Sequence, residues 1–244
     1  MEEIHKAYLH EIFMLIAASL FAAFILSLNV HLPIIKIEET LFLQSFFYML
    51  IIFGVFIAGQ KLVAYSLDCT TTTKLMAFRQ YWFRPLSRYK SGGELKAPFP
   101  VWLILPLVLT LLTNGIIKWL AILNFDVETT TSRIRKRWKE ITEYDVAKIA
   151  VAGPLSLLLL GIISKILGFD SFAMLCAWVA FLSIIPIGAG FKLLMSSRIL
   201  WTFAFILIGA ILLLIKTANA FITVIIAILF AALITIIYYA LYEK

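Results

Sequence analysis

Long apolar runs separated by short polar links fill most of this sequence. Several of them reach the roughly 18 to 20 apolar residues with which an α-helix crosses a bilayer. The runs are 8–30, 41–67, 99–123, 146–167, 172–195, 199–216 and 218–242. Their length and close spacing predict an all-α polytopic membrane protein, with residues 1–244 forming a single membrane domain.

The run at 99–123 is apolar but irregular, because it contains two prolines, an Asn114-Gly115 turn signal and Lys118. Basic residues flank it on both sides, and such residues favour the cytoplasmic side of a membrane. A single crossing would place one basic loop outside, whereas a hairpin returning at Asn114-Gly115 keeps both loops inside. We therefore expect about six transmembrane helices plus a re-entrant hydrophobic hairpin, with a full span over 99–123 as the alternative.

Two runs rich in threonine predict a small surface β element. The segment DCTTTTK (68–74) and the run 129–131 within NFDVETTTSR carry β-branched residues, which favour strands over helices. Although far apart in sequence, these runs are expected to pair beside the membrane.

Two later stretches combine small residues with proline. In KIAVAGPLSLLLL (148–160), Ala152 and Gly153 precede Pro154, a pattern that lets a second helix approach closely. In 181–201, Pro186 and the glycines that follow it predict a broken helix, whose exposed backbone a neighbouring segment must cover. The break is either the wall of a cavity or a packing kink.

Composition and charge agree with a membrane location. Hydrophobic residues make up 63% of the chain and charged residues only 14%, and the net charge is +7. With both basic loops inside, the N- and C-termini are also expected to be cytoplasmic, in a multi-pass protein of the cell membrane. The RIRKRWK segment predicts contact with anionic lipid headgroups rather than nucleic acid. Its candidate residues are Arg133, Arg135, Lys136, Arg137 and Lys139.

The residues needed for known chemistry are scarce. His10-Glu11 begins like an H-E-x-x-H zinc motif, but Met14 replaces the second histidine. The two cysteines form no C-x-x-C pair, and Cys176 reads as a packing residue. The sequence thus predicts no metal and no cofactor. Within the apolar runs, Lys61 is expected to snorkel to the interface, while Gln60 is the more informative polar residue.

Three segments in order resemble the site-2 protease family of intramembrane zinc metalloproteases, particularly its compact prokaryotic members. They are FIAGQK (56–61), AVAGP (150–154) and IPIGAGFK (185–192), and the similarity covers about 47–201. The resemblance implies a protease-like core over 41–201, with two further helices over 199–242. In that family the first segment carries H-E-x-x-H, the second an Asn three residues after A-G-P, and the third N-x-x-P followed by L-D-G.

Carried over by position, the family's chemistry is missing from this chain. Phe56, Ile57 and Gln60 stand where the family has His, Glu and His. Leu157 replaces the Asn after A-G-P, and the last segment likewise lacks its Asn, at Ser183, and its Asp, at or near Ala189. A catalytic zinc needs about three protein ligands and a base for the bound water, so the resemblance implies a protease fold without a protease site.

The expected function is therefore that of a non-catalytic, site-2-protease-like protein. It would bind other integral membrane proteins, as an assembly factor or as a subunit of a membrane complex. The degenerate pocket is expected to be formed by Phe56, Ile57, Gln60, Gly153, Pro154, Ser183, Pro186 and Ala189. The alternative is a membrane-embedded hydrolase or transferase with a site at the inner surface, near Asp68, Glu94, Glu128 and the RIRKRWK segment.

Overall fold

The computed structural model describes residues 2–31, 34–37, 39–80, 94–129, 141–216 and 219–242. This part of the chain is mostly helical, with three small two-stranded sheets. The helices are α1 (Glu2–Ser27), α2 (Glu39–Ser66), α3 (Val101–Leu112), α5 (Glu143–Ile166), α6 (Asp170–Ile184), α7 (Ala189–Ser196), α8 (Arg198–Leu214) and α9 (Ala220–Tyr242). The strands are β1 (Leu28–His31), β2 (Ile34–Ile37), β3 (Cys69–Leu75), β4 (Phe78–Gln80), β5 (Glu94–Phe99) and β6 (Leu123–Thr129).

Four of the described helices, α1, α2, α5 and α9, are long and apolar enough to cross a membrane. The bent pair of α6 and α7 brings the number to five if it counts as one span. The predicted span at 199–216 is α8, which has 17 residues and falls among the shorter apolar helices. These helices indicate a membrane protein, as expected, while the expected number of about six full spans exceeds the number of long helices in the described residues.

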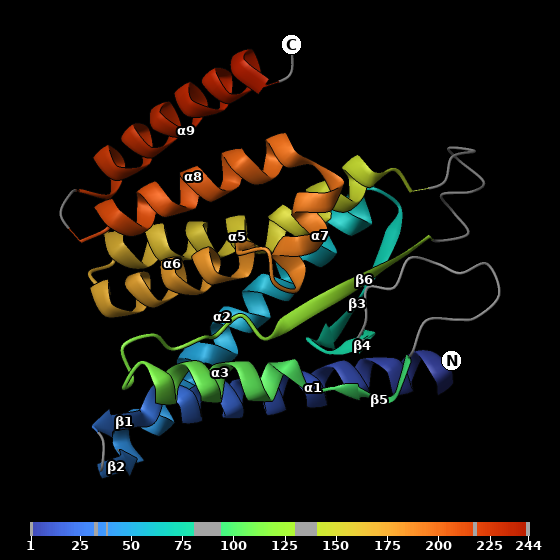
Figure 1. Cartoon of the computed structure of the whole chain (residues 1–244), viewed down its shortest axis with the longest axis vertical. Coiled ribbons are helices and arrows are strands. Elements are labelled where there is room, and N and C mark those ends of the chain that lie inside the picture. The colour runs from blue at the N-terminus through green and yellow to red at the C-terminus, as the bar shows by residue number, and fades with distance from the viewer. Residues whose placement is uncertain are drawn as a thin grey trace.

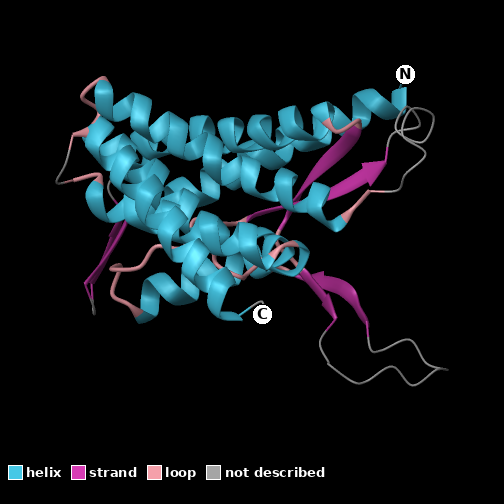
Figure 2. Cartoon of the chain, turned by 90° about the horizontal axis from the view of Figure 1, so that it is seen from above, coloured by secondary structure: helices cyan, strands magenta, loops and turns pink. Residues whose placement is uncertain are grey.

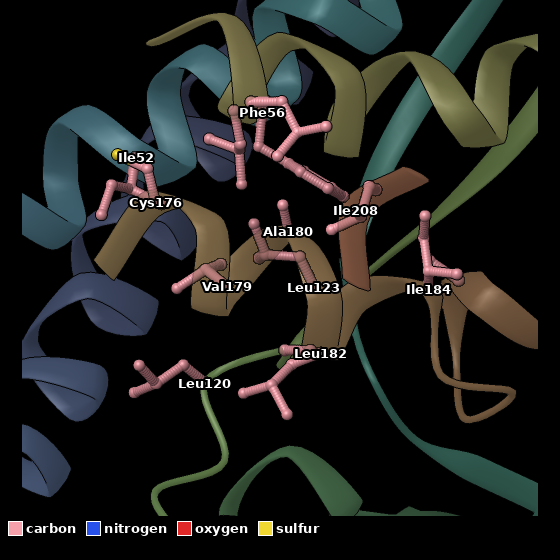
Figure 3. Packing of buried hydrophobic residues seen from close by; sticks show 14 of the residues in the cluster. Ile52, Phe56, Leu120, Leu123, Cys176, Val179, Ala180, Leu182, Ile184 and Ile208 are labelled. Atoms are coloured by element: carbon pink, nitrogen blue, oxygen red, sulfur yellow. The ribbon is translucent and has the colours of Figure 1, made fainter. Parts of the chain in front are cut away.

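The long helices pack side by side in alternating directions (Figure 1). α2 contacts α1 and α5, α5 contacts α6, and α9 lies along α8. Figure 2 shows the same helices from above, with the strands gathered at the edges of the helical layer. The buried apolar side chains of α2, α5, α6 and α8 form one continuous core with the segment that leads into β6 (Figure 3).

The tightest contact in this core joins α2 to α5. A Cβ atom added to Gly59 would lie 2.5 Å from Ser156 Oγ and 3.1 Å from Ala152 O. The Ser156 hydroxyl lies between two acceptors, the Gly153 carbonyl oxygen of its own helix at 2.7 Å and the Val55 carbonyl oxygen of α2 at 3.1 Å. The expectation that small residues of α5 allow close helix packing is therefore confirmed.

The stretch 101–122 forms a hairpin. α3 ends at a turn in which Asn114 and Gly115 have φ angles of 49° and 77°, and the chain then returns in extended form to β6. The Trp102 amide donates to the Met76 carbonyl and the Met76 amide to the Ile122 carbonyl, both at 2.9 Å. Because Met76 bonds both Trp102 at the start of the hairpin and Ile122 at its end, the predicted return of the chain at Asn114-Gly115 is confirmed. The depth of the hairpin in a bilayer stays a prediction.

β3 and β6 form the predicted small sheet, as an antiparallel ribbon with Thr73 opposite Phe125. The pairing is confirmed, but the second strand begins earlier than the run 129–131, at Leu123. Of the predicted run, Thr129 is thus the last residue of β6. The register of β6 against β3 is set by the apolar Leu123 and Phe125, which are buried on one face of the strand. The sequence did not predict the β1–β2 and β4–β5 pairs.

The broken helix also occurs as predicted. α6 and α7 meet at a bend of 56° after Ile184, where Gly188 has a φ of 70°. The Trp201 indole N–H of α8 donates to the Ile184 carbonyl oxygen at 2.9 Å. A neighbouring helix thus satisfies backbone that the break exposes.

We expect Gly59→Ala to lower the free energy of unfolding by about 1–3 kcal/mol, because the new methyl group would push against Ser156 and the α5 backbone. Gly54→Ala is the matched control on the same helix, since a Cβ there meets nothing within 4 Å. That control should be neutral or slightly stabilising. Thermal unfolding in detergent compares the two variants, and an equal loss in both would contradict the close contact.

Candidate functional site

The three segments that resemble protease motifs lie on neighbouring helices, with α5 between α2 and the α6–α7 pair. Phe56 of α2 packs on Gly153 of α5: a Cβ added to Gly153 would lie 2.7 Å from the Phe56 ring. Phe56, Gly153 and Pro154 are buried, and Ile57 is partly buried. At this point the two helices meet through apolar contact, with an aromatic ring filling the space above the glycine.

Gln60 lies one turn beyond Phe56 on the same face of α2. Its side chain is only 2% exposed, and its Nε2 atom has no hydrogen-bond partner in the described part of the chain. A buried amide donor without a partner costs about 1–3 kcal/mol, so natural proteins seldom leave one unpaired. On this face of α2, Gln60 is thus a buried side chain whose N–H donor lacks a hydrogen-bond acceptor among the described residues.

The remaining predicted pocket residues lie at the break between α6 and α7. Ser183 is buried, and its hydroxyl donates to the Ala180 carbonyl of its own helix at 2.7 Å. Ala189 is buried at the start of α7, whereas Pro186 is exposed. The structure brings Phe56 into contact with Gly153, but Ser183 bonds within α6 and Pro186 lies on the surface.

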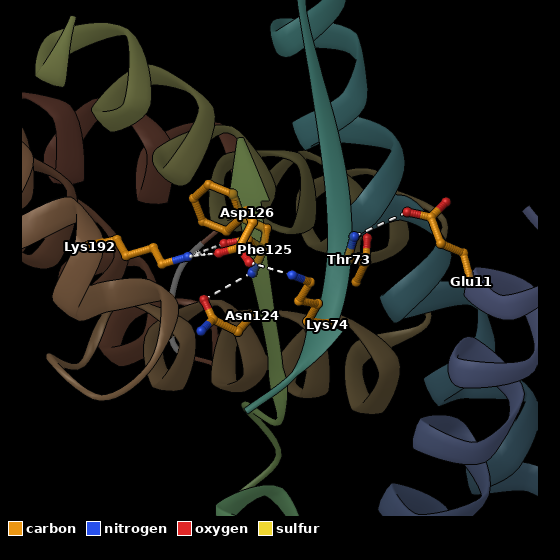
Figure 4. Close-up of polar contacts among 7 residues, drawn as sticks. All are labelled: Glu11, Thr73, Lys74, Asn124, Phe125, Asp126 and Lys192. Carbon is orange, nitrogen blue, oxygen red and sulfur yellow. Dashed lines mark hydrogen bonds and ion pairs between the residues drawn. The ribbon is translucent and has the colours of Figure 1, made fainter. Parts of the chain in front are cut away.

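A polar network along the β3–β6 ribbon escaped the sequence prediction (Figure 4). Glu11 of α1 accepts a hydrogen bond from the Thr73 amide at 3.0 Å and pairs with Lys61 of α2. Lys61 therefore bonds a neighbouring helix instead of snorkelling alone. The sequence feature that could have predicted this pair is an acidic residue near the start of one apolar run and a lysine near the end of the next, because such residues lie at the same end of two antiparallel helices.

The other edge of the ribbon is bonded to α7. The Lys192 ammonium donates to the Asp126 carboxylate at 2.7 Å and to the Phe125 carbonyl oxygen. The Phe125 amide donates to the Asn124 side-chain oxygen at 2.9 Å, and Lys74 of β3 pairs with Asp126 at 2.7 Å. Side chains of α1 and α7 thus hold opposite edges of one ribbon.

Hydrogen bonding to Lys192 and then to Lys74 holds the pKa of Asp126 below its ordinary value, against a smaller opposing effect of burial. The Asp126 side chain is 46% exposed, which weakens both ion pairs by solvent screening. Among the described residues, no group of three or more His, Cys, Asp or Glu side chains lies close enough to hold a metal ion. Asp68 and Glu128, candidates for an inner-surface enzyme site, lie near the same end of the ribbon.

The predicted lipid-headgroup residues Arg133, Arg135, Lys136, Arg137 and Lys139 lie outside the described residues. Comparison of the chain with protein-family models, with curated proteins and with solved structures finds no match. The resemblance to site-2 proteases therefore stays a prediction from the short motifs quoted above.

The lowered pKa of Asp126 predicts a pH dependence of stability. Because the folded state holds the charged carboxylate, its contribution is present above the ordinary pKa of 3.8 and is lost as the pH falls through the lower folded-state pKa. Asp126→Asn should cost up to about 1 kcal/mol at neutral pH and reduce the loss of stability on acidification. Thermal unfolding between about pH 6 and pH 2 measures both effects.

The matched control is Glu128→Gln, which changes an exposed carboxylate two positions along the same strand. We expect its unfolding profile to follow that of the unmodified protein more closely. Identical pH profiles for Asp126→Asn and the unmodified protein would contradict the role assigned to the two lysine contacts.

Proposed function

We propose that this chain is a non-catalytic membrane protein with a site-2-protease-like scaffold. It binds segments of other integral membrane proteins, as an assembly factor or as a subunit of a membrane complex. Its multi-pass helices lie in the cell membrane with both termini cytoplasmic, and the RIRKRWK segment contacts anionic lipid headgroups.

The observation that carries this proposal is the unpartnered amide of Gln60. The group lies on α2, one turn beyond Phe56 and next to Gly59, where α2 approaches α5 closely. Polar side chains in such surroundings join helices by hydrogen bonds across the interface. Because Gln60 Nε2 is buried in the isolated chain, a carbonyl or hydroxyl oxygen of a partner segment would reach it only by displacing the side chains that cover it, and the cost of leaving this donor unpaired would then favour binding.

The residues at the motif positions argue against protease chemistry. Phe56, Ile57 and Ala189 supply neither a zinc ligand nor a base, and Gln60 offers only a neutral amide. A fold that has lost its catalytic residues keeps the helix surfaces that once positioned a substrate, and binding is the activity that such surfaces still support.

The closed edges of the ribbon favour a helical partner over an extended one. At the Thr73–Phe125 rung, Glu11 occupies one edge, and Lys192 and Asn124 occupy the other. An extended segment that added to either strand would have to displace these side chains. A helix packing against α2 would not.

We expect Gln60→Leu to abolish copurification of the partner from native membranes in mild detergent. The same change should leave the isolated chain as stable as before or more stable by about 1 kcal/mol, because it removes a buried unpaired donor. Gln44→Leu is the control on the same helix, since Gln44 is exposed and donates to the Tyr48 hydroxyl at 2.9 Å. It should retain the partner.

Two outcomes would count against the proposal. Equal recovery of the same partner by the Gln60 and Gln44 variants would remove Gln60 from the binding surface. Metal analysis that found one tightly held zinc per chain would contradict the non-catalytic assignment itself.

A further inference from the structure

The hairpin begins partway along α1 rather than beside its start. Its base is bonded to Met76, which lies about 10 Å beyond Thr73 in extended chain. At the same base the Trp102 ring packs edge-on against Phe21 of α1, with ring centroids 5.3 Å apart. Phe21 lies about 15 Å along α1 from Glu11, the residue that bonds the Thr73 amide. The ribbon has therefore already followed α1 over part of its length before the hairpin starts.

The turn of the hairpin lies at the other end of α1. Lys118, just past the turn, donates to the Leu26 carbonyl oxygen at 2.6 Å, and α1 ends at Ser27. Leu26 lies about 22 Å along α1 from Glu11. Figure 1 shows α3 following α1 from the ribbon towards β1, and the two helices are in contact. The ribbon and the hairpin together thus accompany α1 from Glu11 to its last turn.

The returning leg of the hairpin is extended chain inside the protein. Residues 119–122 are buried. The Trp178 indole N–H of α6 donates to the Lys118 carbonyl oxygen at 3.3 Å, and the Trp119 indole N–H donates to the Ala121 carbonyl oxygen at 3.0 Å. Irregular backbone is tolerated at membrane depth only where protein buries it. The burial of this leg and its two tryptophan bonds meet that requirement.

The turn itself carries the polar groups of a membrane surface. Asn114 is exposed, and the Lys118 ammonium follows it closely in the chain. Both groups would be costly in the hydrocarbon interior, which favours a place for the turn at a headgroup layer. The turn between α5 and α6 lies at the same end of the helices (Figure 1), so Asp170, exposed at the start of α6, marks this face independently.

We infer that the segment 94–129 crosses the whole apolar layer and returns. β5 and α3 form the outgoing leg, and the extended chain after the turn forms the incoming leg together with β6. The turn at Asn114-Gly115 lies at the membrane face opposite to the Cys69–Thr129 end of the ribbon. With the basic loops in the cytoplasm, the hairpin presents this turn on the outer side of the membrane. The crossing depends on neither Gln60 nor the partner proposed above, so either can fail without the other.

The test places single cysteines at three exposed positions of the full-length chain. They are Asn114→Cys at the turn, Glu128→Cys near the end of the ribbon and Asp170→Cys between α5 and α6. Cys69 and Cys176 are buried, so the unmodified chain gives the background labelling. A membrane-impermeant maleimide is added to intact cells and, in parallel, to cells opened by sonication. A cysteine at the outer face reacts in both samples, and one at the inner face reacts only in opened cells.

We expect Asn114→Cys to react in the same samples as Asp170→Cys, and Glu128→Cys to show the opposite pattern. Ile116→Cys repeats the measurement at an exposed position that needs no left-handed backbone, and it should agree with Asn114→Cys. Reaction of Asn114→Cys in the pattern of Glu128→Cys would reveal a hairpin that stays on the side of the ribbon, and would overturn the crossing. Reaction only after solubilisation in detergent would place the turn inside the bilayer and overturn it too, as would labelling of Glu128→Cys and Asp170→Cys from one face.

Discussion

A two-stranded ribbon leaves one edge of each strand open, and a backbone group that is buried at such an edge must find another hydrogen-bond partner. The Met76–Ile122 bond fixes which residues face outward, because bonded and non-bonded pairs alternate along an antiparallel ladder. By this alternation Thr73 and Phe125 form a non-hydrogen-bonded pair, so the N–H and C=O groups of each residue point outward from the ribbon. Glu11 bonds the Thr73 amide, while Asn124 and Lys192 bond Phe125. This single rung joins α1 and α7 to the ribbon, so the hairpin and the helices hold one another in place.

α2 and α5 pack closely against each other at two glycines. Gly59 and Gly153 bring the two backbones together, and the Phe56 ring lies against Gly153. The Nε2 atom of Gln60, next to this contact, is buried and has no hydrogen-bond partner in the described residues.

Periodicity and turn signals were enough to predict the helices, the return at Asn114-Gly115 and the break after Ile184. Each of these depends on local sequence, namely on apolar length, on residues that tolerate positive φ and on proline or glycine inside a helix. The polar network could not be predicted with the same ease, because Glu11, Lys61 and Lys192 meet their partners only through the tertiary fold. The sequence predicted that the Lys61 side chain reaches the membrane interface without a partner, because its partner Glu11 is 50 residues away in the sequence. Of the predicted pocket residues, Phe56 and Gly153 touch, whereas Pro186 lies on the surface at the bend, and the pocket itself stays a prediction.

Hydrogen exchange at the Thr73 amide tests most directly whether side chains close the edges of the ribbon. The Glu11 carboxylate should make this outward-facing amide exchange slowly in the unmodified protein, and Glu11→Ala should speed its exchange by about tenfold or more. The inward-facing amides of Thr72 and Lys74 should change less, because β6 still bonds them. A Thr73 amide that already exchanges as fast in the unmodified protein as in the variant would contradict the account.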